Sequence, residues 1–224
     1  MAAHLDLEEQ EQLDQIKHFW AQYGNLITWV LIAVFGSLAA YNGWNYWQRS
    51  QAAKASALYE ELQRATIGSD AAKIERAFND IKDSYGSTTY AAQAAMLAGK
   101  ALFEAKKPDA ARAALTWAMN DASEPAYQGL ARLRLAGMEF DAKAYDQALK
   151  LLDAAMPKAL EPLAQDRKGD ILLAQGKTDD AKVMYLSAWK GLTERVEYRQ
   201  LIEVKLASLG VDVSAQAPAA GVAK

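Results

Sequence analysis

A single apolar segment of 22 residues interrupts the otherwise polar N-terminal part of the chain. No charged residue occurs from Gly24 to Gln48. At 1.5 Å per residue, a helix of this length spans about 33 Å, close to the hydrocarbon thickness of a bilayer. The pattern predicts one membrane-spanning helix over residues 25–47. Its membrane-facing side chains are expected to be Leu26, Ile27, Trp29, Val30, Leu31, Ile32, Val34, Phe35, Leu38, Tyr41, Trp44 and Trp47.

Two other interpretations of this segment have to be weighed. A buried helix of a soluble core is seldom apolar on all sides over such a length. Aromatic residues also flank the segment on both sides, as they do at membrane interfaces. A cleaved signal peptide could end at Ser37-Leu38-Ala39, but the residues before the segment are acidic and the apolar run continues past this point. We therefore favour an uncleaved signal anchor.

Residues 1–24 form a short polar tail before the span. Leu5, Leu7, Leu13 and Ile16 are interspersed with acidic residues there. The stretch is typical of a solvated helix that leads into the membrane. The alternative is a short docking segment for a partner on that side.

Residues 51–85 predict a first pair of helices, and the first of them could continue the membrane helix without a break. A Gly68-Ser69-Asp70 turn separates the two segments, and Gly86 suits the end of the second. Apolar residues recur at helical spacing on both sides of the turn. They are Ala55, Leu58, Leu62 and Ala65 before it, and Ile74, Ala77, Phe78, Ile81 and Tyr85 after it.

From residue 88 onward the chain repeats a pattern of small and large residues. In each copy a small residue (Gly99, Ala136 or Gly169) precedes an alanine by twelve positions, and the copies lie 37 and 33 residues apart. A period near 34 with this spacing is typical of tetratricopeptide repeats. The positions of the pattern are Gly99, Leu102, Ala111, Leu115 and Ala118; Ala136, Ala148, Leu152 and Ala155; and Gly169, Leu172, Gly176, Ala181, Tyr185 and Ala188.

The small residues of the pattern have a packing role. Two antiparallel helices approach closely only where both present small side chains, and a large residue of the second helix then fills the space beside them. Neighbouring pairs bury each other's open faces, which predicts an α-solenoid. The copies are degenerate, because Glu139 replaces an apolar residue and Lys106 and Lys143 stand where glycine usually turns the chain.

Local signals predict where some of these helices begin and end. Gly176 is expected to end a helix and Thr178 to cap the next one, while Ser123 marks a similar start. Tyr145 is expected to begin the second helix of the middle copy.

The end of the chain predicts one more helix and a tail. Residues 196–209 form the helix, with Leu201, Val204 and Leu209 covering the open end of the solenoid, and Gly210 stops it. The repeat domain is thus expected over residues 48–210. Residues 211–224 are rich in small residues and are expected to be disordered.

Composition favours an all-helical protein and excludes several functions. Of 224 residues, 51% are hydrophobic, and residues 51–224 carry 23 acidic and 23 basic residues, which argues against nucleic-acid binding. The chain has no cysteine, and its two histidines, His4 and His18, both precede the span. Cysteine nucleophiles, catalytic triads and histidine-based zinc sites are therefore excluded from the repeat domain. We expect no catalytic residue, no cofactor and no metal.

Charge does not settle how the span is oriented. Lys17 lies on its N-terminal side, and Arg49 and Lys54 lie close on its C-terminal side. The positive-inside rule would place the C-terminal domain in the cytoplasm, but it is weak for so small a difference and for a large flanking domain.

The chain resembles the YfgM family of Gram-negative bacteria. The resemblance covers nearly the whole chain and rests on the acidic tail, the aromatic run YNGWNYW (41–47) and the stretch SYGSTTYAAQAAMLAGKALFEAKKPDAARAAL (84–115). It implies a single-pass inner-membrane protein with a cytoplasmic N-terminus and a periplasmic repeat domain. It also implies an ancillary subunit of the SecYEG translocon that associates with the periplasmic chaperone PpiD and helps hand emerging proteins to periplasmic chaperones.

We therefore expect a non-enzymatic, membrane-anchored interaction protein with SecYEG, a PpiD-like membrane-anchored chaperone and membrane lipid as partners. A cell-envelope assembly adaptor is one alternative, and the absence of cysteine rules out lipoprotein processing for it. A scaffold or regulatory adaptor that faces the cytoplasm is another.

Overall fold

The computed structural model describes residues 7–193 and 197–213, which form nine α-helices and no strand. The chain divides into two compact units, residues 1–51 and 52–224. The helices are α1 (Leu7–Ile67), α2 (Ala71–Tyr85), α3 (Thr89–Glu104), α4 (Pro108–Asp121), α5 (Pro125–Asp141), α6 (Tyr145–Asp153), α7 (Glu161–Ala174), α8 (Thr178–Gly191) and α9 (Glu197–Ser208).

The described part of the first unit is the N-terminal portion of α1. Its apolar segment contains one threonine and one serine, and the hydroxyl groups of both bond within the helix. Thr28 donates to the carbonyl of Gly24 at 2.8 Å, and Ser37 donates to that of Ala33 at 2.6 Å. Because a hydrocarbon environment offers polar groups no partner, this internal pairing suits a membrane span.

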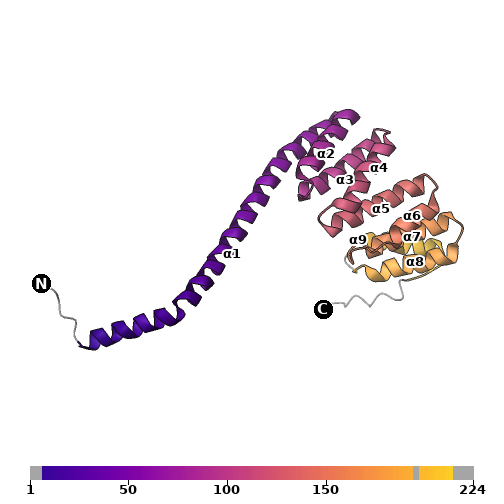
Figure 1. Cartoon of the computed structure of the whole chain (residues 1–224). Helices are drawn as coiled ribbons and strands as arrows, with labels where there is room; N and C mark the ends of the chain where they lie inside the picture. The colour runs from indigo at the N-terminus through magenta and orange to yellow at the C-terminus, as the bar shows by residue number, and fades with distance from the viewer. Residues whose placement is uncertain (1–6, 194–196, 214–224) are drawn as a thin grey trace, which may run out of the picture. The chain divides into compact units, whose positions relative to one another are not determined.

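The second unit is a series of antiparallel helix pairs. The C-terminal part of α1 and α2 contribute to one hydrophobic core, and α3/α4, α5/α6 and α7/α8 follow as pairs. Figure 1 shows helices α2 to α8 following one another along the domain, and α9 contacts α8. The predicted architecture, an apolar N-terminal helix followed by a tetratricopeptide-like solenoid with a C-terminal capping helix, is confirmed.

Three hydrophobic clusters run along the solenoid and keep it continuous. The first joins α1 to α5, the second joins α5 to α7, and the third joins α7 to α9. Each cluster is built where one pair covers the open face of the next, as expected for a repeat protein. The core residues contributed by the first pair are Ala55, Leu62, Ile74, Ala77, Phe78 and Ile81, while Leu58, Ala65 and Tyr85 are half-buried.

The first helices of successive pairs end in the same way. Lys106, Lys143 and Gly176 each adopt a positive φ, of 60°, 60° and 77°, just after α3, α5 and α7. The next backbone N–H then returns to a carbonyl in the last turn, as in the bond from Lys177 to Leu172 at 2.9 Å. This is the Schellman motif, which favours glycine. Two lysines therefore hold a backbone conformation that suits glycine better.

Two predicted helix starts are wrong by one residue. Thr178 is the first residue of α8 and makes no capping bond, because Lys177 occupies the N-cap. Glu124 rather than Ser123 precedes Pro125 at the start of α5, and the Ser123 hydroxyl instead donates to the carbonyl of Ser87 at 3.1 Å. Tyr145 begins α6 as predicted.

The C-terminal end differs from the prediction in its buried face. Leu201 and Val204 are exposed, and Ile202 and Leu206 are buried in their place. Val213 is also buried in the third cluster, so the packed chain extends past the expected boundary at residue 210. The rest of the predicted disordered tail, residues 214–224, lies outside the described residues.

Candidate interaction sites

The apolar segment of α1 is uncovered within its unit. The large side chains predicted to face the membrane are 46–66% exposed, apart from Ile27, which is half-buried. Only 6% of the most apolar stretch is buried. A helix of a soluble core is mostly buried, so this exposure favours the membrane-spanning interpretation. The exposed set is Leu26, Trp29, Val30, Leu31, Ile32, Val34, Phe35, Leu38, Tyr41, Trp44 and Trp47.

Aromatic pairs flank this segment at both ends. The rings of Phe19 and Tyr23 lie 5.1 Å apart between centroids, and those of Trp44 and Trp47 lie 5.3 Å apart. Amphipathic rings of this kind favour the headgroup regions of a bilayer. By length and composition, this is a helix able to cross a membrane.

The small residues of the repeats lie where the paired helices come closest. A Cβ atom built on Gly99 would lie 2.6 Å from Cγ of Leu115, and one on Gly169 would lie 2.5 Å from Cε1 of Tyr185. In the middle copy, Ala136 shares a buried cluster with Leu152. The structure thus brings together the large and small positions of each copy. Ala111, Ala118, Ala148, Ala181 and Ala188 are fully buried, Leu102 is buried, and Leu172 is half-buried.

Ala155 does not belong to this scaffold. α6 ends at Asp153, Ala154 is extended, and Ala155 is exposed in the connection that follows. Its carbonyl accepts a hydrogen bond from Nη1 of Arg132 at 2.5 Å. The prediction for this residue is wrong because the second helix of the middle pair is shorter than its counterparts α4 and α8.

The degenerate position in the middle copy has a specific partner. Glu139 is only 7% exposed, and its carboxylate forms an ion pair with the guanidinium of Arg112 on α4. Because a buried carboxylate is costly unless it is paired, Arg112 makes a charged residue possible where an apolar one was expected.

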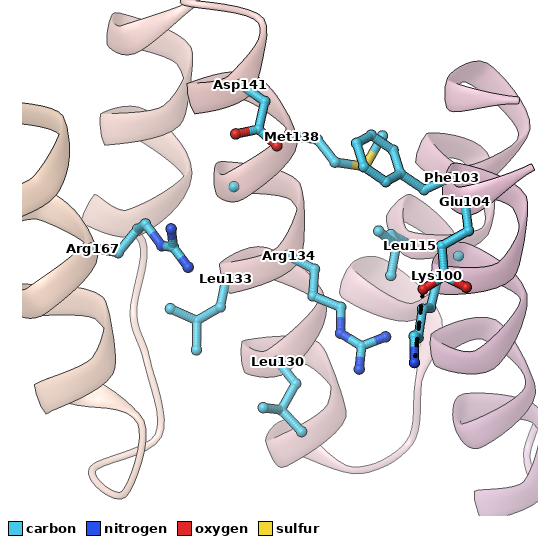
Figure 2. A pocket seen from close by; sticks show the side chains of 12 residues that line it. Lys100, Phe103, Glu104, Leu115, Leu130, Leu133, Arg134, Met138, Asp141 and Arg167 are labelled. Atoms are coloured by element: carbon cyan, nitrogen blue, oxygen red, sulfur yellow. Dashed lines mark ion pairs between the residues drawn. The ribbon is translucent and has the colours of Figure 1, made fainter. Parts of the chain in front are cut away.

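A groove of about 470 Å³ lies along the first helices of the pairs. It is lined by α3, α5 and α7, with Leu115 of α4 at its base, and Figure 2 shows its side chains. Leu130, Leu133, Met138 and the exposed ring of Phe103 supply apolar surface. The charged residues of the lining are Lys100, Glu104, Arg134, Asp141 and Arg167.

One of these charged groups is held firmly in place. Nη1 of Arg134 donates to the carbonyl of Met96 on α3 at 2.6 Å. Partial burial disfavours the charged form and lowers the pKa of Arg134 below its ordinary value. Lys100 and Glu104 form an ion pair at 3.9 Å on the same side of the groove. The arrangement can bind a chain segment, but it contains no nucleophile paired with a base.

A partly buried polar network attaches α9 to α7. The Lys205 ammonium donates to Asp166 at 2.8 and 3.0 Å and to Asp170 at 2.6 Å. The hydroxyl of Tyr198 donates to Asp166 at 2.5 Å, and that of Tyr185 donates to Asp170 at 2.8 Å. Burial first, and then these hydrogen bonds, raise the pKa of both tyrosines above the ordinary value. The network is structural, because it fixes the last helix in position.

Sequence reasoning identified neither the groove nor this network. Arg134 and Arg167 each lie two residues before the small residue of their repeat, so an alignment of the copies could have found them. Asp166 and Lys205 carry no such signal, because they come from helices that are far apart in the sequence.

Comparison with known proteins places the chain in a family. Residues 17–211 match a family described as a tetratricopeptide repeat-like domain. The chain is 30% identical over 213 residues to a Neisseria gonorrhoeae protein named ancillary SecYEG translocon subunit, covering 93% of this chain and 100% of that protein.

Two further relatives carry the same name. An Aggregatibacter actinomycetemcomitans protein is 32% identical over 91% of this chain and 98% of its own length. An Escherichia coli protein is 26% identical over 81% of this chain and 85% of its own length. No solved structure matches the chain. With the family match and the near full-length alignments, the chain belongs to the tetratricopeptide repeat-like family of ancillary SecYEG translocon subunits that its sequence resembles.

Proposed function

We propose that this protein is a membrane-anchored, non-enzymatic ancillary subunit of a SecYEG translocon. The observation that carries the proposal is an apolar helix left uncovered within its unit, in a chain that aligns almost end to end with proteins of that name. Residues 25–47 span the inner membrane and contact lipid and translocon helices. Residues 1–24 form the tail before it, and the repeat domain begins at residue 48 and extends to at least Val213.

In this proposal the N-terminus is cytoplasmic and the repeat domain is periplasmic. The few basic residues near the span, Lys17 against Arg49 and Lys54, favour the opposite orientation. Large domains translocate largely regardless of charge, so this difference weighs little against the family assignment.

The repeat domain acts by binding rather than by chemistry. Its groove receives a segment of an emerging protein, and a PpiD-like membrane-anchored chaperone is the partner to which that protein is handed. Anchoring matters energetically, because a weak contact becomes effectively intramolecular once both partners sit at the same translocon. The apolar and charged lining of the groove supports this role.

Affinity purification from native membranes in mild detergent tests the proposal. The full-length protein should recover SecY and a PpiD-like chaperone, identified by mass spectrometry. Deleting residues 1–48 should abolish their recovery. A second variant exchanges residues 25–47 for an unrelated apolar helix of equal length, which separates membrane attachment from specific helix contacts. Recovery of only cell-envelope assembly or cytoplasmic regulatory proteins would contradict the proposal, as would full association by the soluble fragment.

The orientation can be tested directly because the chain has no cysteine. Gln12→Cys and Ser69→Cys each introduce one thiol at an exposed position on either side of the span. A membrane-impermeant maleimide applied to spheroplasts should label the thiol at 69 and not the one at 12. The reverse pattern would place the repeat domain in the cytoplasm.

A further inference from the structure

Two arginines occupy the same position in successive repeats. Arg134 lies two residues before Ala136, and Arg167 lies two residues before Gly169. Figure 2 shows both side chains reaching into the groove in the same direction, Arg134 from α5 toward α3 and Arg167 from α7 toward α5. The groove therefore presents one guanidinium at each of two consecutive steps of the solenoid.

Neither guanidinium has an acidic partner in the described part of the chain. Among the residues drawn in Figure 2, the marked ion pair joins Lys100 to Glu104. Once this pair is set aside, the lining retains two arginines against the single carboxylate of Asp141. The groove thus carries an excess of positive charge next to apolar surface, although the domain as a whole is nearly neutral.

Arg134 is prepared to receive an anion. Its bond to the Met96 carbonyl fixes the plane of the guanidinium and uses one of its donors. The remaining N–H groups stay available for a carboxylate, which guanidinium binds with two parallel hydrogen bonds. A partly buried cation without a counter-charge gains more from such a ligand than a fully solvated cation does.

The spacing of the two arginines defines the ligand. Neighbouring packed helices lie about 8–10 Å apart. A polyproline II chain advances about 3.1 Å per residue with three residues per turn, so side chains three residues apart lie on the same side of it and about one repeat step apart. We propose that the groove binds a polypeptide segment in the polyproline II conformation with two acidic side chains three residues apart, one for each arginine. Apolar side chains of the same segment pack on Phe103, Leu133 and Met138. This inference rests on the proposed function and adds the chemistry of the bound segment.

Binding of short labelled peptides to the full-length protein in detergent micelles tests the inference. The probe is a twelve-residue peptide of Ala, Ser and Leu with two Glu three residues apart, and fluorescence anisotropy reports its binding. The matched peptides carry Gln at the same two positions, or two adjacent Glu. We expect the spaced acidic probe to bind about tenfold or more tightly than either, because one hydrogen bond to a charged group contributes this much.

Variants of the protein locate the bound segment. Arg134→Gln and Arg167→Gln should each weaken binding of the acidic probe about tenfold. Arg76→Gln is the matched control, because Arg76 is exposed on α2 and does not line the groove. Replacing both groove arginines by Glu should reverse the preference, so that a peptide with two Lys at the same spacing binds better than the acidic probe.

Three results would overturn the inference. They are equal binding of the acidic and Gln peptides, an unchanged affinity in both Gln variants whose circular dichroism matches the parent, and no binding of any probe at millimolar concentration. The peptide assay contains no translocon. A negative peptide result therefore does not affect the proposed association with SecYEG, and a negative co-purification result does not affect the peptide affinities.

Discussion

Gly169→Ala offers the sharpest test of how the paired helices pack. The added methyl group would lie 2.5 Å from Cε1, 2.6 Å from Cδ1 and 2.9 Å from Cζ of Tyr185. The tyrosine ring has little room to withdraw, because it is fully buried and its hydroxyl bonds Asp170 at 2.8 Å. The Lys205 ammonium also lies 5.2 Å from the ring centre. Either α7 and α8 separate or the polar network shifts.

The expected cost follows from two opposing effects. Overpacking a well-filled site costs about 1–3 kcal/mol, and the fixed ring places this site in the upper part of that range. Alanine regains about 1 kcal/mol over glycine in a helix interior. The free energy of unfolding should therefore fall by about 1–2 kcal/mol, and Tm should fall by about 3–6 °C for a domain of this size.

Thermal unfolding followed by far-UV circular dichroism measures the effect. The matched control is Gly137→Ala on α5, where an added Cβ meets nothing within 4 Å. The control substitution should add only the higher helix propensity of alanine over glycine, so its Tm should rise by about 2–4 °C. The reasoning is refuted if Gly169→Ala leaves Tm unchanged or raises it as Gly137→Ala does. Gly169→Leu should cost more than the alanine variant.

Three further predictions concern the helix ends and the C-terminal network. Lys143→Gly should raise the free energy of unfolding by up to about 1 kcal/mol, because glycine adopts the φ of 60° without the steric cost of a side chain; thermal unfolding measures this. Asp166→Asn should lower it by about 2–3 kcal/mol, because it leaves a partly buried ammonium short of its counter-charge; urea unfolding at pH 7 measures this. The raised pKa values of Tyr185 and Tyr198 mean that the native state keeps both phenols protonated, so stability should be constant below about pH 10 and fall above it, as the unfolded chain ionises first.

Each of these predictions has a control and a contradicting result. The control for Lys143→Gly is Lys150→Gly, on the exposed face of α6, which should lower Tm. A lower Tm for both variants would contradict the prediction for Lys143→Gly. The control for Asp166→Asn is Asp179→Asn, at a highly exposed carboxylate, which should change the free energy of unfolding little. An equal effect of the two substitutions would contradict the prediction for Asp166→Asn. For the third, Tyr198→Phe should make the alkaline loss smaller, and a urea midpoint that stays constant from pH 8 to 11 would contradict it.

The repeat pattern predicted the paired helices because close helix contact needs small residues at fixed spacing. Gly99 and Gly169 mark the contacts with Leu115 and Tyr185, and these positions can be read from one copy to the next. The signal is local, since the two residues of each contact are only sixteen positions apart in the sequence. The membrane-spanning helix could also be predicted from the sequence, because its pattern depends only on length, apolar character and flanking aromatic residues.

The buried face of α9 could not be read in this way. Apolar residues occur around much of that helix, and the face chosen by the fold includes Ile202, Leu206 and the partly buried Lys205. From the sequence alone, a lysine is expected to be exposed to solvent. Its burial becomes possible only through Asp166 and Asp170, which lie 39 and 35 residues earlier.

The groove escaped prediction for a related reason. In the sequence, Arg134 and Arg167 look like ordinary surface residues, because a charged residue on a helical repeat usually faces solvent. What distinguishes them is that the fold aligns their helices side by side and turns both guanidinium groups into one groove. Ala155 shows the converse, because a repeat position was assigned where the helix had already ended at Asp153.

The ion pairs between α7 and α9 also affect the order of folding. Contacts within α7 and α8 can form as soon as that pair has been synthesised, because its residues are close in the sequence. Asp166 and Asp170 acquire the ammonium of Lys205 only after α9 has been synthesised. A product truncated before α9 leaves two carboxylates close together without that cation and exposes the apolar face that Ile202 and Leu206 cover. The stability of the α7/α8 pair thus depends on the synthesis of α9, and products truncated before α9 are expected to be preferred targets for proteolysis.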